Sequence, residues 1–162
     1  MVSPRALHAG FKLTDEVAKV HDKVKHQQMD FAVFTIEKEK LVVKAYFPLT
    51  DSEEREFKED EDKWKTFKAR VYPSLYGILV DTLTPCFVSL DFKCYQGTRK
   101  IQKLIFMFWC PDKTPVREKM QAASTYQQLA DKLSASSKYE AHDAAKISYK
   151  QMLSFVVDHA HS

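Results

Sequence analysis

Residues 104–120 read LIFMFWCPDKTPVREKM, and this stretch changes from one structural pattern to another within a few residues. Residues 104–109 are apolar without alternation, which is typical of a central strand covered on both faces. Thr114 then fits an N-cap and Pro115 the first position of a helix, and helical periodicity continues to Leu133. The stretch therefore predicts a buried strand that leads into a long helix.

The predicted helix over residues 114–133 has two different faces. One apolar stripe, which we assign to the core, consists of Ala122, Tyr126, Leu129 and Leu133. The roughly opposite stripe, to which the first turn adds Lys119, consists of Arg117, Met120, Ser124 and Gln127. A single exposed methionine among solvated charges is common in proteins. The combination of apolar and cationic groups on one face also fits a helix that docks in the groove of a partner.

Helices and strands alternate along the rest of the chain. Helical spacing indicates helices over residues 15–26, 64–71, 75–83 and 144–157, with Thr14 as an N-cap and Pro73 as an interruption. β-Branched and aromatic runs indicate strands over residues 31–36, 41–47 and 86–95 and near Tyr139, with turns over residues 37–40 and 96–98. The order α-β-β-α-β-β-α-β-α, without repeats or a linker, predicts one α/β (α+β) sandwich.

The composition is that of an ordinary globular protein, with 162 residues, 44% of them hydrophobic and 29% charged. This length suits one domain over residues 1–162 with a sizeable core. Cys86, Cys94 and Cys110 are odd in number and two lie in apolar runs, which indicates buried thiols in a reducing compartment. With no membrane-length apolar run and no signal-like N-terminus, we expect a cytoplasmic protein.

The net charge of +3 hides an asymmetry along the chain. Residues 51–62 contain eight acidic residues against Arg55 and Lys58, a local charge of −6, which indicates a solvated loop. The rest of the chain then carries +9, from 23 basic less 14 acidic residues. This balance favours an acidic partner, whether a protein, a phosphoinositide or a nucleic acid.

The segment around the tryptophan resembles a known family. Trp109, Pro111 and Asp112, followed by TPVREKM at residues 114–120, closely resemble the signature of actin-depolymerising factor/cofilin proteins. That signature is an aromatic strand ending in Trp-x-Pro-(Asp/Glu), then Ala-Pro-(Val/Leu)-(Arg/Lys)-x-Lys-Met. The resemblance extends to residues 10–15, 90–92 and 147–153. It is weakest over residues 51–75, where we expect an acidic insertion loop at residues 50–62.

The resemblance implies the ADF-homology fold, which is gelsolin-like: a central mixed sheet of five or six strands flanked by helices. It implies a monomeric protein of the actin cytoskeleton that binds actin monomers and filaments and promotes filament severing and depolymerisation. Inhibition by phosphoinositides is also implied. No catalytic group, metal or other cofactor is implied.

The same resemblance assigns roles to individual residues. The long helix would wedge between two subdomains of actin, with Arg117 and Lys119 on acidic and polar groups and Met120 in an apolar cleft. The N-terminal segment from Ala9 would lie beside this helix and contact the same actin monomer. The implied monomer-binding residues are Ala9, Gly10, Phe11, Arg117, Lys119, Met120 and Ser124.

Family members that bind filaments well use a second basic surface, on the hairpin before the tryptophan strand and on the last helix. Here Lys100 and Lys103 supply the hairpin charges, but Ile101 stands where an arginine is common. On the last helix the usual charges are replaced by Ser154, Phe155 and Asp158. We therefore expect filament binding to be weaker than monomer binding.

The N-terminus also departs from the family. The regulatory serine that precedes the family's glycine aligns with Ala9, so the usual phosphorylation site is missing at this position. Ser3 lies within residues 1–8, which we expect to form a flexible N-terminal extension.

Three other functions remain open on the sequence alone. A relative of the glia maturation factor or coactosin type would bind a nucleating complex or filaments without depolymerising them. An enzyme is disfavoured because the six histidines show no metal-ligand spacing and no phosphate-binding loop or nucleophile motif is present. A nucleic-acid binder is disfavoured because the basic residues are dispersed and no recognition motif is present.

Overall fold

Two β-hairpins build most of the sheet in the computed structural model, which describes residues 14–48 and 63–159. The first hairpin joins β1 (Phe31–Glu37) to β2 (Lys40–Phe47), and the second joins β3 (Cys86–Gln96) to β4 (Arg99–Trp109). Lys38 and Glu39 have φ values of 50° and 66°, as a two-residue hairpin turn requires. The predicted turn at residues 37–40 is therefore confirmed.

The strand order is β2-β1-β3-β4-β5, and the sheet is mixed. β1 pairs with β3, and these pairings and both hairpins are antiparallel. β5 (Lys138–Ala141) lies parallel to β4 after the crossover through the long helix. The prediction of a central mixed sheet with five or six strands is confirmed with five.

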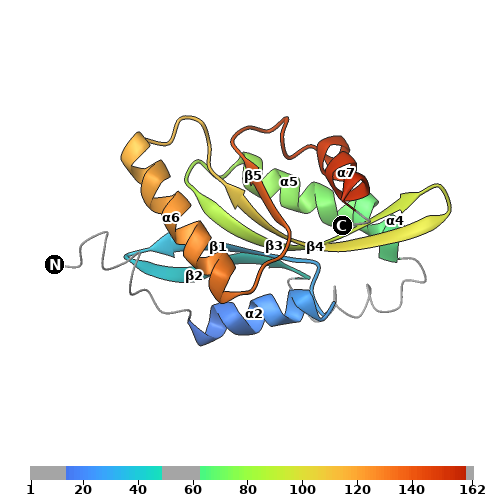
Figure 1. The fold of residues 1–162 in the computed structure, drawn as a ribbon, viewed down its shortest axis with the longest axis horizontal. Coiled ribbons are helices and arrows are strands. Elements are labelled where there is room, and N and C mark those ends of the chain that lie inside the picture. The colour runs from blue at the N-terminus through green and yellow to red at the C-terminus, as the bar shows by residue number, and fades with distance from the viewer. Residues whose placement is uncertain (1–13, 49–62, 160–162) are drawn as a thin grey trace.

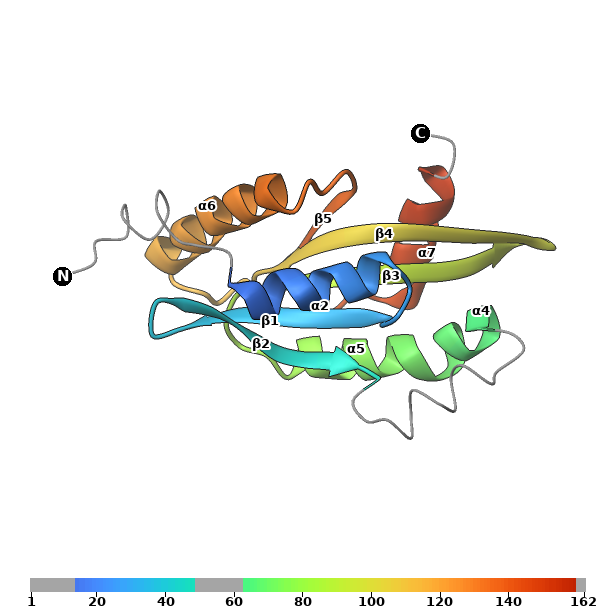
Figure 2. The same cartoon turned by 90° about the horizontal axis from the view of Figure 1, so that it is seen from below.

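Helices cover both faces of this sheet (Figures 1 and 2). α2 (Asp15–Lys25) and α6 (Val116–Lys132) pack on one face, and α5 (Tyr72–Val80) and α7 (Tyr149–Asp158) pack on the other. The predicted N-cap of α2 is confirmed, because the Thr14 hydroxyl accepts a hydrogen bond from the Val17 N–H at 3.3 Å.

β4 is buried on both faces, as its continuous apolar run predicted. Ile105, Met107 and Trp109 enter the core beneath α5 and α7, whereas Phe106 and Phe108 enter the core beneath α2 and α6. β4 lies inside the sheet between β3 and the short β5, but the middle strand of the five is β3.

Three helix boundaries differ from the predictions. α6 begins at Val116 with Pro115 as its N-cap, and no side chain caps it, so Thr114 is not the cap. The last helix begins at Tyr149 and not near residue 144, because the Ser148 hydroxyl accepts from the Gln151 N–H and sets the start. α5 ends at Val80, three residues earlier than expected.

Pro73 does not interrupt its helix as predicted. α4 (Lys63–Thr66) continues through a π-helical turn at Phe67–Val71 directly into α5. Proline lacks an N–H and clashes with the carbonyl four residues earlier, and the wider turn relieves both problems within a continuous helix.

The expected extension at residues 1–8 and the acidic loop at residues 50–62 lie outside the described residues. The same holds for Ala9, Gly10 and Phe11.

Candidate functional site

The long helix α6 is held on the sheet by an aromatic stack. The Tyr126 ring packs against Phe106 and Phe108, with centroids 5.1 and 5.0 Å away. Its hydroxyl donates a hydrogen bond to the Phe106 carbonyl at 2.6 Å. Ala122 and Leu129 are also buried, so the predicted core stripe is confirmed. This attachment fixes the orientation of the opposite face of the helix.

The outer face of α6 exposes apolar and cationic groups together. Val116 and Met120 are 71% and 69% exposed and lie one helical turn apart. Arg117 is exposed, Lys119 is half-buried, and neither forms an ion pair with another described residue. A shallow depression on this face is lined by Val116, Arg117, Met120, Gln121 and Ser124.

The structure thus brings together four of the predicted monomer-binding residues and adds one. Arg117, Lys119, Met120 and Ser124 all belong to α6. Val116 was missed by the sequence reasoning, although its position four residues before Met120 places it on the same helix face.

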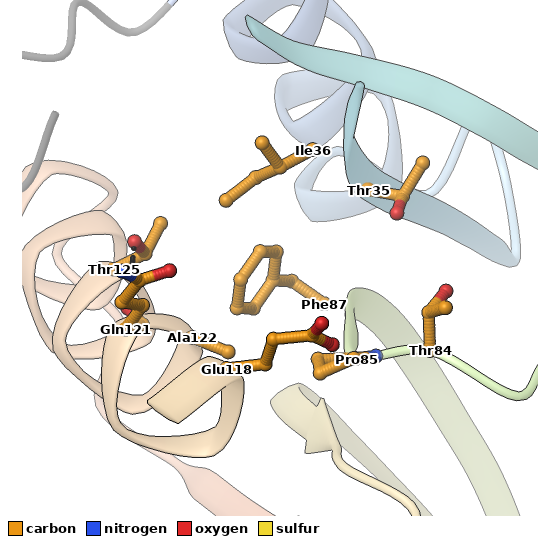
Figure 3. A pocket seen from close by; sticks show the side chains of 9 residues that line it. All are labelled: Thr35, Ile36, Thr84, Pro85, Phe87, Glu118, Gln121, Ala122 and Thr125. Atoms are coloured by element: carbon orange, nitrogen blue, oxygen red, sulfur yellow. Dashed lines mark hydrogen bonds between the residues drawn. The ribbon is translucent and has the colours of Figure 1, made fainter. Parts of the chain in front are cut away.

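A deeper cavity of about 250 Å³ adjoins this face (Figure 3). It lies between α6, the end of β1 and the loop that leads into β3. Gln121 lines both the cavity and the shallow depression, so the two are neighbours on either side of this residue. Its lining residues are Thr35, Ile36, Thr84, Pro85, Phe87, Glu118, Gln121, Ala122 and Thr125.

The predicted filament-binding lysines lie at the other end of the sheet, on the β3–β4 hairpin (Figures 1 and 2). The Lys100 ammonium lies 4.9 Å from the centroid of the Trp64 ring. Lys103 donates a hydrogen bond to the His159 carbonyl at 3.0 Å, at the C-terminal end of α7. Ile101 is only 6% exposed and belongs to the core. Its side chain therefore does not occupy a surface position where an arginine could reach a partner.

The last helix offers little charge beside this hairpin. Phe155 packs on Tyr139 with ring centroids 4.9 Å apart, while Ser154 and Asp158 are exposed. Asp158 adds an exposed acidic residue at this position, where the family resemblance led us to expect a basic one.

The described part of the chain shows neither a reactive cysteine nor a metal-binding cluster. Cys86, Cys94 and Cys110 are free and buried, and burial raises the pKa of each thiol, to about 12 for Cys86. These thiols stay protonated and unreactive near neutral pH. Within residues 14–48 and 63–159, no group of three or more His, Cys, Asp or Glu side chains could hold a metal ion. None of the helices described there is both long and apolar enough to cross a bilayer.

Comparison with known proteins places this geometry in a family. The family model for cofilin/tropomyosin-type actin-binding proteins matches residues 10–156. No curated protein matches the sequence. Several solved structures share the fold.

The ADF-like UNC-60A protein of Caenorhabditis elegans is 21% identical, with a TM-score of 0.70 over 95% of this chain and 99% of its own. Actin depolymerization factor 2 of Plasmodium berghei is 18% identical, with a TM-score of 0.70 over 92% of this chain and 97% of its own. Human coactosin-like protein is 9% identical, with a TM-score of 0.65 over 94% of this chain and 92% of its own. At these identities the structures establish the fold alone.

The family model spans nearly the whole chain, and the mixed five-stranded sheet with flanking helices matches the fold of the ADF/cofilin structures. The family consists of actin-binding proteins and not of enzymes. The chain therefore belongs to the cofilin/tropomyosin-type family of actin-binding proteins.

Proposed function

We propose that this protein binds actin monomers through the outer face of α6 and promotes the severing and depolymerisation of actin filaments. The observation that carries the proposal is a rigidly held helix that exposes Val116 and Met120 beside two cations, neither of which forms an ion pair with residues 14–48 or 63–159. Large exposed apolar side chains that are fixed in place mark interaction surfaces. The N-terminal segment with Ala9, Gly10 and Phe11 would contact the same monomer.

The dimensions and energies suit a wedge between two subdomains of actin. The 17 residues of α6 span about 26 Å at about 1.5 Å per residue. Burial of the Met120 side chain would contribute about 1.5–3 kcal/mol. Arg117 and Lys119 add favourable contacts with an acidic surface, and such contacts also raise the association rate.

Filament binding is the weaker activity in this proposal. Lys100 and Lys103 would contribute, but Ile101 is buried and the last helix adds an acidic residue where a base would help. The protein would then bind actin monomers more tightly than filaments in the cytoplasm. The basic balance of the chain outside residues 51–62 supports phosphoinositides as inhibitory ligands.

The proposal is tested by reversing both charges, Arg117→Glu with Lys119→Glu. Loss of a close charge contact at a buried interface costs about 2–5 kcal/mol, so monomer affinity should fall at least about 30-fold. The matched control, Lys19→Glu with Lys25→Glu, makes the same charge change on exposed positions of α2 and should retain most of the affinity. Unchanged monomer affinity in the α6 variant would refute the proposed site.

The alternative is a regulator of the glia maturation factor or coactosin type. Co-sedimentation with filaments and pyrene-actin disassembly, measured together with the monomer titration, separate the two. Binding to filaments or to a nucleating complex, without monomer binding or disassembly, would support the alternative.

A further inference from the structure

The cavity beside α6 is built from fixed parts. Its floor is Phe87, which is 1% exposed and stacks on Phe108 and Tyr126 with centroids 5.8 and 6.3 Å away. Its far wall is the loop at residues 84–85. Two residues before this loop, the Thr82 carbonyl accepts a hydrogen bond from Trp109 Nε1 at 3.0 Å, and the Thr82 hydroxyl accepts one from Lys44 Nζ at 3.1 Å. A cavity with such walls exists before any partner arrives.

The chemistry of the lining selects the kind of group that fits. Ile36, Pro85 and Ala122 join Phe87 as apolar surface. Figure 3 shows the Glu118 side chain extending from α6 towards Pro85 and Thr84. Among residues 14–48 and 63–159, no lysine or arginine lines the cavity, and the Glu118 carboxylate has no ion-pair partner. Within the described part of the chain, the cavity thus presents a carboxylate without an ion-pair partner above an aromatic and aliphatic floor.

We propose that this cavity binds a lysine or arginine side chain of the same actin monomer that α6 contacts. The aliphatic stem of the side chain lies on Phe87 and Ile36, and its cationic head pairs with Glu118. Long cationic side chains bury their stems along apolar surface in this way, and an aromatic ring also attracts the cation. The inference rests on the proposed function, because the cavity shares Gln121 with the outer face of α6.

Removal of the Glu118 charge should either raise or lower the affinity for actin, and the direction of the change distinguishes two situations. If the first turns of α6 met only acidic groups of the partner, a carboxylate there would be repelled, and its removal would tighten binding. If the carboxylate pairs with a cation in the cavity, its removal weakens binding. The two situations predict opposite changes in affinity for the same substitution at one exposed residue.

The test is a monomer titration with Glu118→Gln, which keeps the shape and removes the charge. Affinity should fall at least threefold, while Glu118→Asp, which keeps the charge, should lose less. The control Asp131→Asn removes the same charge from an exposed position near the other end of α6 and should stay within twofold of the unaltered protein. Equal or tighter binding by Glu118→Gln overturns the inference.

The remaining rival occupant is this chain's own N-terminal segment, which carries Arg5 and Lys12. Alanine at both positions, combined with Glu118→Gln, completes a double-mutant cycle. If Glu118→Gln weakens monomer binding equally with and without the two alanines, the result supports a cation from actin. If Glu118→Gln has no effect once both alanines are present, the inference is overturned. If the Arg117 and Lys119 reversal leaves actin binding intact, the proposed function fails. If that reversal abolishes binding and Glu118→Gln does not weaken it, only the present inference fails.

Discussion

Replacement of Lys93 by methionine should destabilise the protein severely, although Lys93 lies outside the proposed binding face. Its ammonium is 2.8 Å from Asp30 Oδ1 and 3.0 Å from Asp91 Oδ2, and the Lys93 and Asp91 side chains are each only 4% exposed. Gln102 Nε2 lies within hydrogen-bonding distance of both Asp91 oxygens, at 2.9 and 2.8 Å. Burial lowers the pKa of Lys93, but Asp30 and Asp91 outweigh it and leave that pKa raised. Lys93 therefore stays charged at neutral pH.

The expected loss follows from the carboxylate that the substitution leaves behind. Lys93→Met keeps the aliphatic stem but leaves Asp91 buried without its cation, which costs about 3–5 kcal/mol. For a chain of this size, each kcal/mol lowers the melting temperature by about 2–4 °C, so a fall of about 10 °C is expected. Adding Asp91→Asn should recover part of the loss, because it removes the unpaired charge.

Urea unfolding followed by circular dichroism measures both variants. The pKa of Lys93 is raised in the folded protein, so the contribution of Lys93 to the free energy of unfolding is fully present below pH 10.5, the pKa in the unfolded chain. That contribution disappears only as the pH rises through the pKa of Lys93 in the folded protein. A loss below 1 kcal/mol for Lys93→Met at pH 7 would show that the cluster is hydrated and would refute the reasoning. Equal losses for the single and double variants would refute the role given to Asp91.

The other predictions concern pH, filaments and the N-terminus. Burial lowers the pKa of His21, so stability should fall as the pH drops below about 6.5, and His21→Gln should reduce this dependence in acid unfolding curves. Ser154→Arg adds a base at an exposed position of α7 and should increase co-sedimentation with filaments, whereas tighter filament than monomer binding by the unaltered protein would contradict the premise. Ala9→Glu should weaken monomer binding strongly, and Ser3→Glu should weaken it less than about tenfold, or 1.4 kcal/mol. The reverse order in monomer titrations would show that the N-terminal register is wrong.

The fold could be predicted from sequence wherever one local pattern decides the outcome. The unbroken apolar run at residues 104–109 indicated burial on both sides, and Thr14 before an apolar repeat indicated a helix start. Thr114 looked equivalent, but Pro115 has ψ near 144°, so the chain is still extended there and the threonine lies one residue too early to cap α6. Pro73 was misjudged because the relief comes from a π-helical turn in the preceding residues, which no periodicity reveals.

The site was predictable only in part, for a related reason. The periodicity of one helix placed Arg117, Met120 and Ser124 on a common face. The cavity, in contrast, needs residues 35–36, 84–87 and 118–125 to meet, and nothing in the separate segments indicates that meeting. Glu118 read alone is one more solvated charge in a helical first turn. Its significance appears only when the aromatic floor and the loop wall are placed beside it.

The two predicted actin-binding regions also differ in how rigidly the fold presents them. The outer face of α6 is fixed from beneath by Tyr126, whose stacked ring and hydrogen bond to β4 leave the helix little freedom to rotate. The hairpin lysines are instead engaged within the protein, Lys100 by an aromatic ring and Lys103 by a carbonyl at the end of α7. The proposed filament contact would have to displace or share these interactions, whereas the proposed monomer contact with α6 would cover Val116 and Met120, which are already exposed. Under the proposed function, this difference in cost would favour monomer binding over filament decoration more than the number of charges at either end does.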